Sequence, residues 1–282
     1  MFLLRLWSRL PLGLLHGMGA VAGWLTFFIS ASYRRRLLAH ARMAGVSPWG
    51  AVASAGRMLF EIPWLWLRPR HLALGKRAQW EGAERLEAVL SQGRGLLVMT
   101  PHLGCFEVAA QAYAERFGER APMTALYRPA RQPWLRDLVA ASRDRDGLKA
   151  APATLTGVRQ MLRALKKGEC VGLLPDQVPP EGLGVWVPFF GHPAYTMTLA
   201  ARLMQQTGAA VVLLWCERLS WGRGFVVHGR DFQAPPPEAS LEEATWAVNQ
   251  AMEGLILEAP QQYLWGYNRY KAPRGLDLGV AP

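Results

Sequence analysis

Cysteine is scarce in this sequence, and its three cysteines, Cys105, Cys170 and Cys216, lie far apart. An odd number of separated cysteines indicates neither a disulfide framework nor a C-x-x-C metal or redox site. Cys170 and Cys216 lie in apolar runs typical of buried strands, and the catalytic face is most simply placed in a reducing cytoplasm. Cys105 follows His102 by three residues, but the histidine of a Cys–His pair usually comes from elsewhere in the sequence, so Cys105 is a weak candidate nucleophile.

Several functional signatures are also missing. There is no P-loop, dinucleotide-binding glycine fingerprint or H-E-x-x-H helix. No zinc-finger, leucine-zipper or RNA-binding signature is present, and there is no serine elbow of the G-x-S-x-G type. We therefore predict a protein with no metal, no cofactor and no nucleic-acid partner, and we regard a serine hydrolase as the weaker interpretation.

Charge is scarce overall and absent from one long segment. Only 19% of the residues are charged, against roughly 25% in a typical soluble domain, and the 24 residues from Leu10 to Tyr33 include none. A helix of this length would be about 36 Å long, enough to cross the roughly 30 Å hydrocarbon core of a bilayer. Gly19 and Gly23 are spaced for close helix packing, as are Gly13 and Gly17.

Arginines flank this apolar segment on both sides. Arg5 and Arg9 precede it, as in a signal peptide, but Arg34, Arg35 and Arg36 follow it at once. These three arginines argue against export and would hold this end at the cytoplasmic face. We predict that residues 1–36 are an uncleaved membrane anchor, spanning or deeply embedded. The alternative is a helix packed on the catalytic domain and half immersed in the interface.

The net charge of +11 lies mostly near that anchor. Residues 1–100 carry +9, residues 101–200 carry +3 and residues 201–282 carry −1. Such an excess beside an apolar segment favours contact with anionic membrane lipids, and the twelve tryptophans suit a membrane interface. The tryptophan-rich segment 59–68 is either a second interfacial element or a core helix broken at Pro63.

Strand and helix patterns alternate after Gly95, which predicts an α/β fold with a mostly parallel central sheet flanked by helices. The catalytic domain would comprise residues 37–282, with helices over residues 37–92. The expected strands are 95–100, 122–127, 169–174, 209–215 and 224–229. The expected helices are 103–117, 132–143, 154–167, 194–207 and 240–258, the last with a capping box at Ser240–Glu243.

A histidine and an acid stand where the first of these strands ends. His102 lies in the strand-to-helix turn and Glu107 in the first helical turn. Ligands bind at the carboxyl ends of strands in such folds. A carboxylate on one imidazole nitrogen leaves the other nitrogen as a base, so the pair is a candidate general base. Backbone N–H groups near Gly104 are candidate donors to an oxyanion. On spacing alone, a structural role for both residues is equally acceptable.

Polar residues follow two other predicted strands. Arg128 follows the second strand, and Asp176 with Gln177 follows the third. Arg143 begins the alternating charge run 143–146 at the end of the next helix, which by itself is more often a solvated surface. If the sheet is parallel, Asp176 lies in the same layer as His102. Phe189–Phe190 would line an acyl-chain slot or belong to the core. The aromatic and basic segment 260–271 would bind a sugar or headgroup, or cap the sheet edge.

Taken together, these motifs resemble the late acyltransferases of lipid A biosynthesis, in the lysophospholipid acyltransferase superfamily. The resemblance rests on five ordered pieces along nearly the whole chain: His102–Glu107, Tyr127–Arg128–Pro129, Pro175–Asp176–Gln177, Pro188–Ala194, and Gln262–Trp265 with Arg269–Tyr270–Lys271. The family often has Asn-Trp before the acid, whereas this chain has Cys105–Phe106, which places acceptor or chain-length preference in question.

The resemblance implies a glycerolipid acyltransferase-like fold and transfer of an acyl chain from acyl carrier protein to a hydroxyl of a lipid A precursor. The reaction would take place at the cytoplasmic face of the inner membrane. It implies His102 as general base, Glu107 as the group that orients it, and Gly104, Arg128, Arg143, Asp176 and Gln177 near the substrates. Two alternatives stay open: transfer to a different acceptor, such as a glycolipid, aminolipid or lysophospholipid, and a non-catalytic lipid-binding protein on the same fold.

Overall fold

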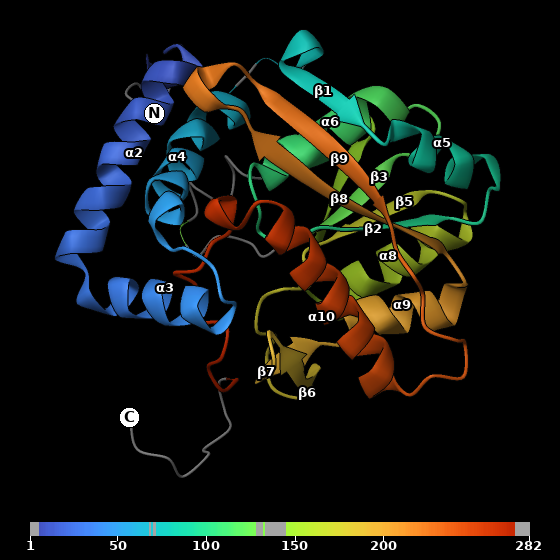
Figure 1. The fold of residues 1–282 in the computed structure, drawn as a ribbon. Helices are drawn as coiled ribbons and strands as arrows, with labels where there is room; N and C mark the ends of the chain where they lie inside the picture. The colour runs from blue at the N-terminus through green and yellow to red at the C-terminus, as the bar shows by residue number, and fades with distance from the viewer. Residues whose placement is uncertain (1–5, 68, 70–71, 128–131, 133–144, 274–282) are drawn as a thin grey trace.

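The computed structural model describes residues 6–67, 69, 72–127, 132 and 145–273 of the chain (Figure 1). Its centre is a seven-stranded sheet with the order β1-β9-β8-β2-β5-β3-β4. All neighbouring pairs are parallel except β8 and β9, which are antiparallel. The strands are β1 (Ala78–Glu81), β2 (Leu96–Met99), β3 (Met123–Tyr127), β4 (Leu148–Pro152), β5 (Cys170–Leu173), β8 (Ala210–Arg218) and β9 (Phe225–Asp231).

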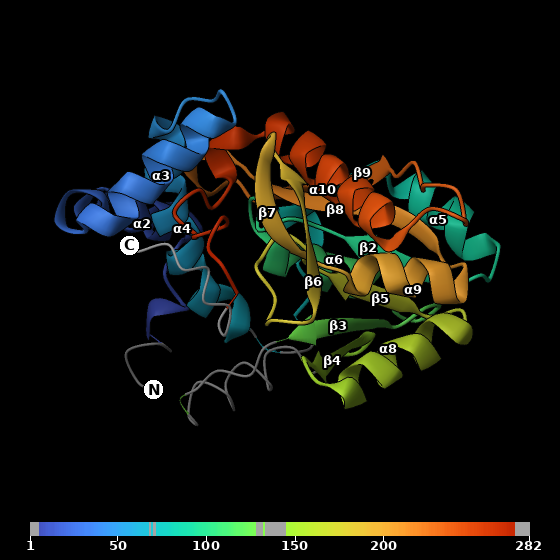
Figure 2. The same ribbon diagram turned by 90° about the horizontal axis from the view of Figure 1, so that it is seen from below.

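Helices cover both faces of this sheet because the central strands are apolar on both sides. In β2, Leu97 and Met99 join the core under one layer of helices, whereas Leu96 and Val98 join the core under the other. The first layer is α8 (Leu155–Lys166), α9 (Leu199–Thr207) and α10 (Leu241–Glu258), seen in front of the sheet in Figure 2. The second layer is α5 (Ala83–Ser91) and α6 (Phe106–Phe117).

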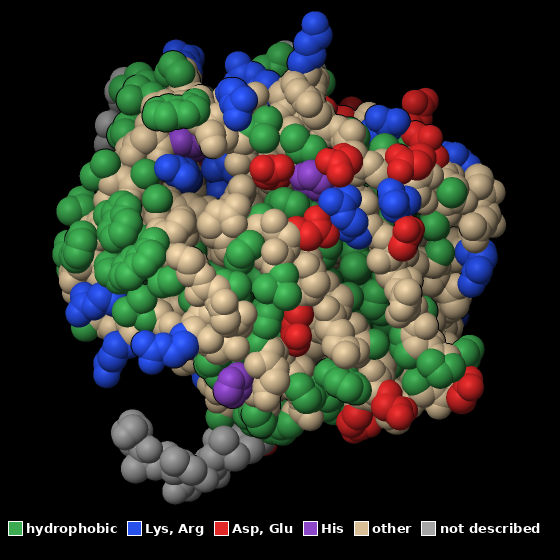
Figure 3. Space-filling view, viewed as in Figure 1, with side chains coloured by type: hydrophobic (Ala, Val, Ile, Leu, Met, Phe, Trp, Pro, Cys, Tyr) green, Lys and Arg blue, Asp and Glu red, His purple; other side chains and the backbone are tan. Residues whose placement is uncertain are grey.

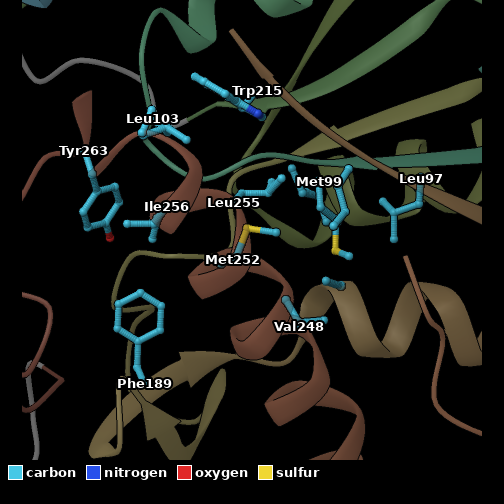
Figure 4. Close-up of a cluster of buried hydrophobic side chains, with 14 of the residues drawn as sticks. Leu97, Met99, Leu103, Phe189, Trp215, Val248, Met252, Leu255, Ile256 and Tyr263 are labelled. Carbon is cyan, nitrogen blue, oxygen red and sulfur yellow. The ribbon is translucent and has the colours of Figure 1, made fainter. Parts of the chain in front are cut away.

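The core under the first layer lies between α10 and the middle of the sheet (Figure 4). Val248, Met252 and Leu255 recur at helical spacing along α10 and face the sheet residues Met99 and Trp215. Ser240 and Glu243 form the predicted capping box at the start of α10. The cap therefore determines where α10 begins, and the apolar face determines which side of it packs on the sheet.

Three helices form a separate layer at the N-terminal end: α2 (Leu12–Ile29), α3 (Ala31–Met43) and α4 (Trp49–Trp66). Helices α2 and α4 lie side by side (Figure 1). A Cβ atom added at Gly19, Gly23 or Gly56 would overlap the backbone of the facing helix, so glycine permits this close approach. The predicted packing role of Gly19 and Gly23 is confirmed, with α4 as their partner. The same role predicted for Gly13 and Gly17 is wrong, because Gly13 faces the Trp221 backbone and an added Cβ at Gly17 would meet nothing within 4 Å.

Helix α4 contributes to the core, as one of the two interpretations of segment 59–68 predicted, although Leu59 on the same helix is exposed. Its Leu65 is fully buried and Trp64 is nearly so. The helix also continues through Pro63 to Trp66, where the sequence suggested a break.

The expected parallel sheet is confirmed. All five predicted strands are present, and their boundaries agree within two residues apart from the longer end of β8. Two predicted helices start too early. Helix α6 begins at Phe106 and not at residue 103. Residues 192–197 form β7 (His192–Met197), which pairs antiparallel with β6 (Gly184–Phe189), so α9 begins only at Leu199. Short strands β1 and β4 also lay outside the prediction. The helix predicted over 132–143 falls almost wholly outside the described residues.

Candidate active site

The site lies where two adjacent parallel strands end. Met99 at the end of β2 pairs with Leu173 at the end of β5, so the loops that follow leave the sheet side by side. The first loop carries His102 and the second carries Asp176, as expected for a parallel sheet. His102 Nδ1 is 2.7 Å from Asp176 Oδ1, and the His102 backbone N–H donates to Asp176 Oδ2 at 2.9 Å. One carboxylate therefore holds both the ring and the backbone of the histidine.

The hydrogen bonds define the tautomer of His102. Burial acts to raise the pKa of Asp176, but the interactions with His102, which include two hydrogen bonds, outweigh it, and the pKa is lowered. Asp176 is therefore a carboxylate that accepts from Nδ1–H. The Gln177 amide Nε2 lies 3.0 Å from His102 Nε2, where it donates to the ring lone pair. Nε2 is thus the basic nitrogen, and it points at the side chain that follows Asp176.

Glu107 lies in the first turn of α6, as predicted, and its Oε2 accepts from Trp66 Nε1 at 3.4 Å. The contact with Nδ1 that the spacing predicted for Glu107 is made by Asp176 in this structure. The physical reason is sheet topology: Asp176 leaves the neighbouring strand directly opposite His102. A catalytic role for Glu107 stays a prediction.

Gly104 forms the turn between His102 and α6. Its φ is +61°, and an added Cβ would overlap the carbonyl of Cys216, so only glycine fits here without strain. Its N–H donates to the Gln262 carbonyl at 3.0 Å, and the next N–H, of Cys105, donates to the Cys216 carbonyl at 2.8 Å. These two amides are therefore occupied in this structure. Stabilisation of an oxyanion by the other backbone N–H groups at the start of α6 stays a prediction.

The two residues that depart from the family motif have different surroundings. The ring of Phe106 packs edge-on against His102 with centroids 4.9 Å apart. Cys105 is buried, and burial, followed by the nearby Glu61 charge, raises the pKa of its thiol well above the usual value. A thiol held in this way is a poor nucleophile, which agrees with its low rank as a candidate.

Two predicted substrate residues, Arg128 and Arg143, lie outside the described residues. The remaining aromatic motifs are anchored by buried side chains, and a sugar or headgroup site in segment 260–271 stays a prediction. Phe189 is buried in the core, and Arg269, only 2% exposed, donates to the Tyr195 carbonyl at 2.9 Å and to Thr196 Oγ1 at 2.6 Å. The segment 260–271 therefore fastens the β6–β7 hairpin to the sheet, and its tryptophan Trp265 is buried as well.

Sequence reasoning missed a buried ionic cluster behind the Gly104 turn. Arg218, at the end of β8, forms a two-pronged ion pair with Glu61 of α4, and His16 of α2 joins the same carboxylate. The only available signal was an isolated acid, Glu61, in an otherwise apolar segment. Within the described residues, no group of three or more His, Cys, Asp and Glu side chains is arranged to hold a metal ion.

Comparison with known proteins identifies consistent relatives. Residues 50–272 match the family model described as bacterial lipid A biosynthesis acyltransferase. The chain is 29% identical over 228 residues to a lipid A biosynthesis lauroyltransferase of Escherichia coli (strain K12), covering 79% of this chain and 71% of that protein. It is 28% identical over 224 residues to a lipid A biosynthesis palmitoleoyltransferase of the same strain, covering 77% and 69%.

A third relative is a lipid A biosynthesis acyltransferase of Haemophilus influenzae (strain ATCC 51907 / DSM 11121 / KW20 / Rd). The chain is 29% identical to it over 196 residues, which cover 68% of this chain and 58% of the relative. The matched region of the family model includes the loops of His102, Asp176 and Gln262.

Proposed function

Because this chain belongs to the bacterial lipid A biosynthesis acyltransferase family, we propose that it transfers a fatty acyl chain from acyl carrier protein to a hydroxyl of a lipid A precursor. The observation that supports this chemistry is the His102 ring, held by Asp176 at Nδ1 and presenting Nε2 to the Gln177 amide. Membership of the family supports acyl transfer; the donor, the acceptor hydroxyl and the roles of individual residues are the proposal.

In the proposed reaction, the acceptor hydroxyl takes the place of the Gln177 amide at Nε2. His102 removes the hydroxyl proton as the oxygen attacks the thioester carbonyl, so a C–O bond forms. The C–S bond then breaks, and the thiol of the carrier receives the proton from His102. A base in this position typically contributes about 10²–10⁴-fold to the rate. Asp176 stabilises the imidazolium that forms between the two proton transfers.

We assign Gln177 to the oxyanion. Its amide is within hydrogen-bonding distance of Nε2, so a substrate carbonyl attacked beside Nε2 would lie within reach of the same N–H group. A neutral amide donor of this kind is typically worth about 10²–10³-fold. Gln177 is proposed in addition to the backbone N–H groups at the start of α6. Glu107 stays a candidate for orienting His102, and its contribution to the transfer rate is compared with that of Asp176 by substituting each residue.

The membrane contact is proposed for the outer face of α2. Its exposed apolar residues recur at helical spacing: Leu14, Met18, Val21, Leu25 and Phe28. Figure 3 shows hydrophobic side chains gathered along this edge, with Lys and Arg side chains below them over α3. The inner face of α2 packs on α4, which favours a helix half immersed in the interface over an independent span.

The arginines of α3 suit this arrangement. Arg35 and Arg42 lie beyond the end of the apolar face, where they would meet anionic lipids of the cytoplasmic leaflet. Basic residues here also suit a phosphorylated acceptor and an acidic carrier protein. We therefore propose the cytoplasmic face of the inner membrane as the location, with residues 1–36 as the membrane-contacting part of the chain.

The test is a transfer assay with acylated acyl carrier protein and a lipid A precursor in mixed micelles. Wild-type protein should form the acylated product and His102→Ala should not. If His102→Ala, folded as judged by circular dichroism, retains near-wild-type transfer, the mechanism is wrong.

The acceptor is tested separately by mass spectrometry of total lipids from a deletion strain. Loss of one acyl chain from lipid A supports the proposal. Unchanged lipid A together with the loss of another acylated lipid would assign the same chemistry to a different acceptor, such as a glycolipid, aminolipid or lysophospholipid.

A further inference from the structure

A buried ionic cluster joins the N-terminal helices to the sheet. Glu61 of α4 is 1% exposed and Arg218 of β8 is 6% exposed. Arg218 Nε lies 2.7 Å from Glu61 Oε2, and its Nη2 bonds Glu61 Oε1. His16 Nε2 of α2 lies 3.0 Å from Glu61 Oε2, and Ser54 Oγ accepts from Arg218 Nη1 at 3.1 Å. Each nitrogen of the guanidinium thus has a partner within the protein.

The same guanidinium reaches the active-site turn. Arg218 Nη2 donates to the Gly104 carbonyl at 3.0 Å. The Gly104 N–H is held from the other side by the Gln262 carbonyl at 3.0 Å, and the Gln262 side chain bonds both the N–H and the carbonyl of Arg218. The peptide units two residues after His102 are therefore clamped by a closed ring of hydrogen bonds that contains a buried charge.

Stability alone does not account for this arrangement. Replacing a buried ion pair by apolar residues of similar volume is often neutral or stabilising, since desolvation offsets the attraction between the charges. Burial acts to raise the pKa of Glu61, yet the charge and hydrogen bond of Arg218 lower it, so both members stay ionised. The ionised guanidinium of Arg218 is a strong and directional donor to the Gly104 carbonyl.

We infer that Arg218 and Glu61 are positioning residues for the base: they fix the Gly104 turn, and through it the direction in which His102 presents Nε2 to the acceptor hydroxyl. The inference rests on the proposed acyl transfer. It also connects α2, the helix proposed to contact the membrane, to the catalytic turn, because His16 and Gly104 contact the two ends of the same ion pair.

The test separates positioning from folding. In the double variant Glu61→Gln with Arg218→Met, both buried charges are removed together, so no unpaired ion is left, and the glutamine keeps a partner for His16. We expect the thermal unfolding midpoint to stay near that of the wild type. The donor to Gly104 is lost, so kcat should fall by about 10- to 100-fold, the cost of displacing a catalytic group by about 1 Å, with KM for the acyl donor unchanged.

A second variant, Arg218→Lys, keeps the charge but loses the fork that spans Glu61 and Gly104. It should also lower kcat, and it decides the question if the double variant does not fold. The matched control is Glu258→Gln with Arg230→Met, which removes a half-exposed ion pair between α10 and β9 (2.8 Å) and should leave kcat unchanged.

Two failures are distinguishable in this experiment. If the wild-type protein transfers no acyl chain to the lipid A precursor, the proposed function fails and the inference fails with it. If the wild type is active and either folded Arg218 variant keeps kcat within twofold, the proposed function stands and the positioning role is overturned.

Discussion

Substituting Asp176 by asparagine should abolish the base function of His102 with almost no change in side-chain volume. In the native site one oxygen of Asp176 accepts from the His102 backbone N–H and the other accepts from Nδ1–H. Asparagine has a single side-chain oxygen, and the backbone N–H can only donate. In Asp176→Asn that oxygen would therefore pair with the backbone N–H, and the new NH₂ group would face Nδ1.

That exchange inverts the tautomer of the ring. Facing an NH₂ donor, Nδ1 must accept, so the proton moves to Nε2, the nitrogen that needs a lone pair to take the proton of the acceptor hydroxyl. The expected loss in kcat is the whole general-base contribution, about 10²–10⁴-fold. This corresponds to about 2.7–5.4 kcal/mol of transition-state stabilisation.

The measurement is steady-state transfer from acylated carrier protein to the lipid A precursor in micelles. The matched control is Asp231→Asn, an exposed carboxylate paired with Arg85, which should be silent. Glu107→Gln is compared in the same series, because the sequence predicted that Glu107 orients the ring. If Asp176→Asn is folded and within threefold of wild type while Glu107→Gln is inactive, the assignment of Asp176 to Nδ1 is refuted.

Three further outcomes are expected. Gly104→Ala should lower the thermal unfolding midpoint, since a left-handed backbone costs a non-glycine residue about 1–2 kcal/mol before the clash with the facing carbonyl; an unchanged midpoint would contradict this. The folded-state pKa values of Asp176 and Glu61 are lowered. Their contribution to the free energy of unfolding is therefore fully present above the unfolded-state pKa values of about 3.9 and 4.3, and it is lost as the pH falls through the folded-state values. Urea unfolding should therefore show a free energy of unfolding that falls from neutral to acidic pH. The slope of this free energy against pH should be smaller for Glu61→Gln than for the wild type, and equal slopes would contradict the contribution of Glu61. Leu25→Glu on the outer face of α2 should reduce flotation with anionic vesicles, whereas Leu155→Glu on α8, also exposed, should not; equal flotation would remove α2 from the membrane contact.

The central strands could be predicted because burial on both faces leaves a continuous apolar run such as Leu96–Met99. The β6–β7 hairpin could not, because β7 has two exposed residues followed by three buried ones and so lacks the regular alternation that marks a strand. It also ends at Met197, just before α9 begins at Leu199. Strands β1 and β4 are only four and five residues long. They form at the sheet edges, where hydrogen bonding to β9 and β3 stabilises an extended conformation that their own residues favour only weakly.

At the site, the sequence alone determined which chemistry is available: a histidine at one strand end, an acid and an amide at another, and an apolar segment followed by arginines. Strand order placed the two loops together once the sheet was taken as parallel. Which carboxylate reaches Nδ1 was decided by the tertiary structure, because Asp176 projects from the strand that pairs directly with the strand of His102.

The tertiary structure alone also decided how the Gly104 turn is held. Its partners, Gln262, Cys216 and Arg218, come from distant parts of the chain and share no spacing that a sequence pattern could show. Hydrogen bonds between backbone groups carry no residue signature, since every non-proline residue has the same donor and acceptor. The sequence thus indicated a histidine as the proposed base, whereas the orientation of its ring and its link to the N-terminal helices arose only from folding.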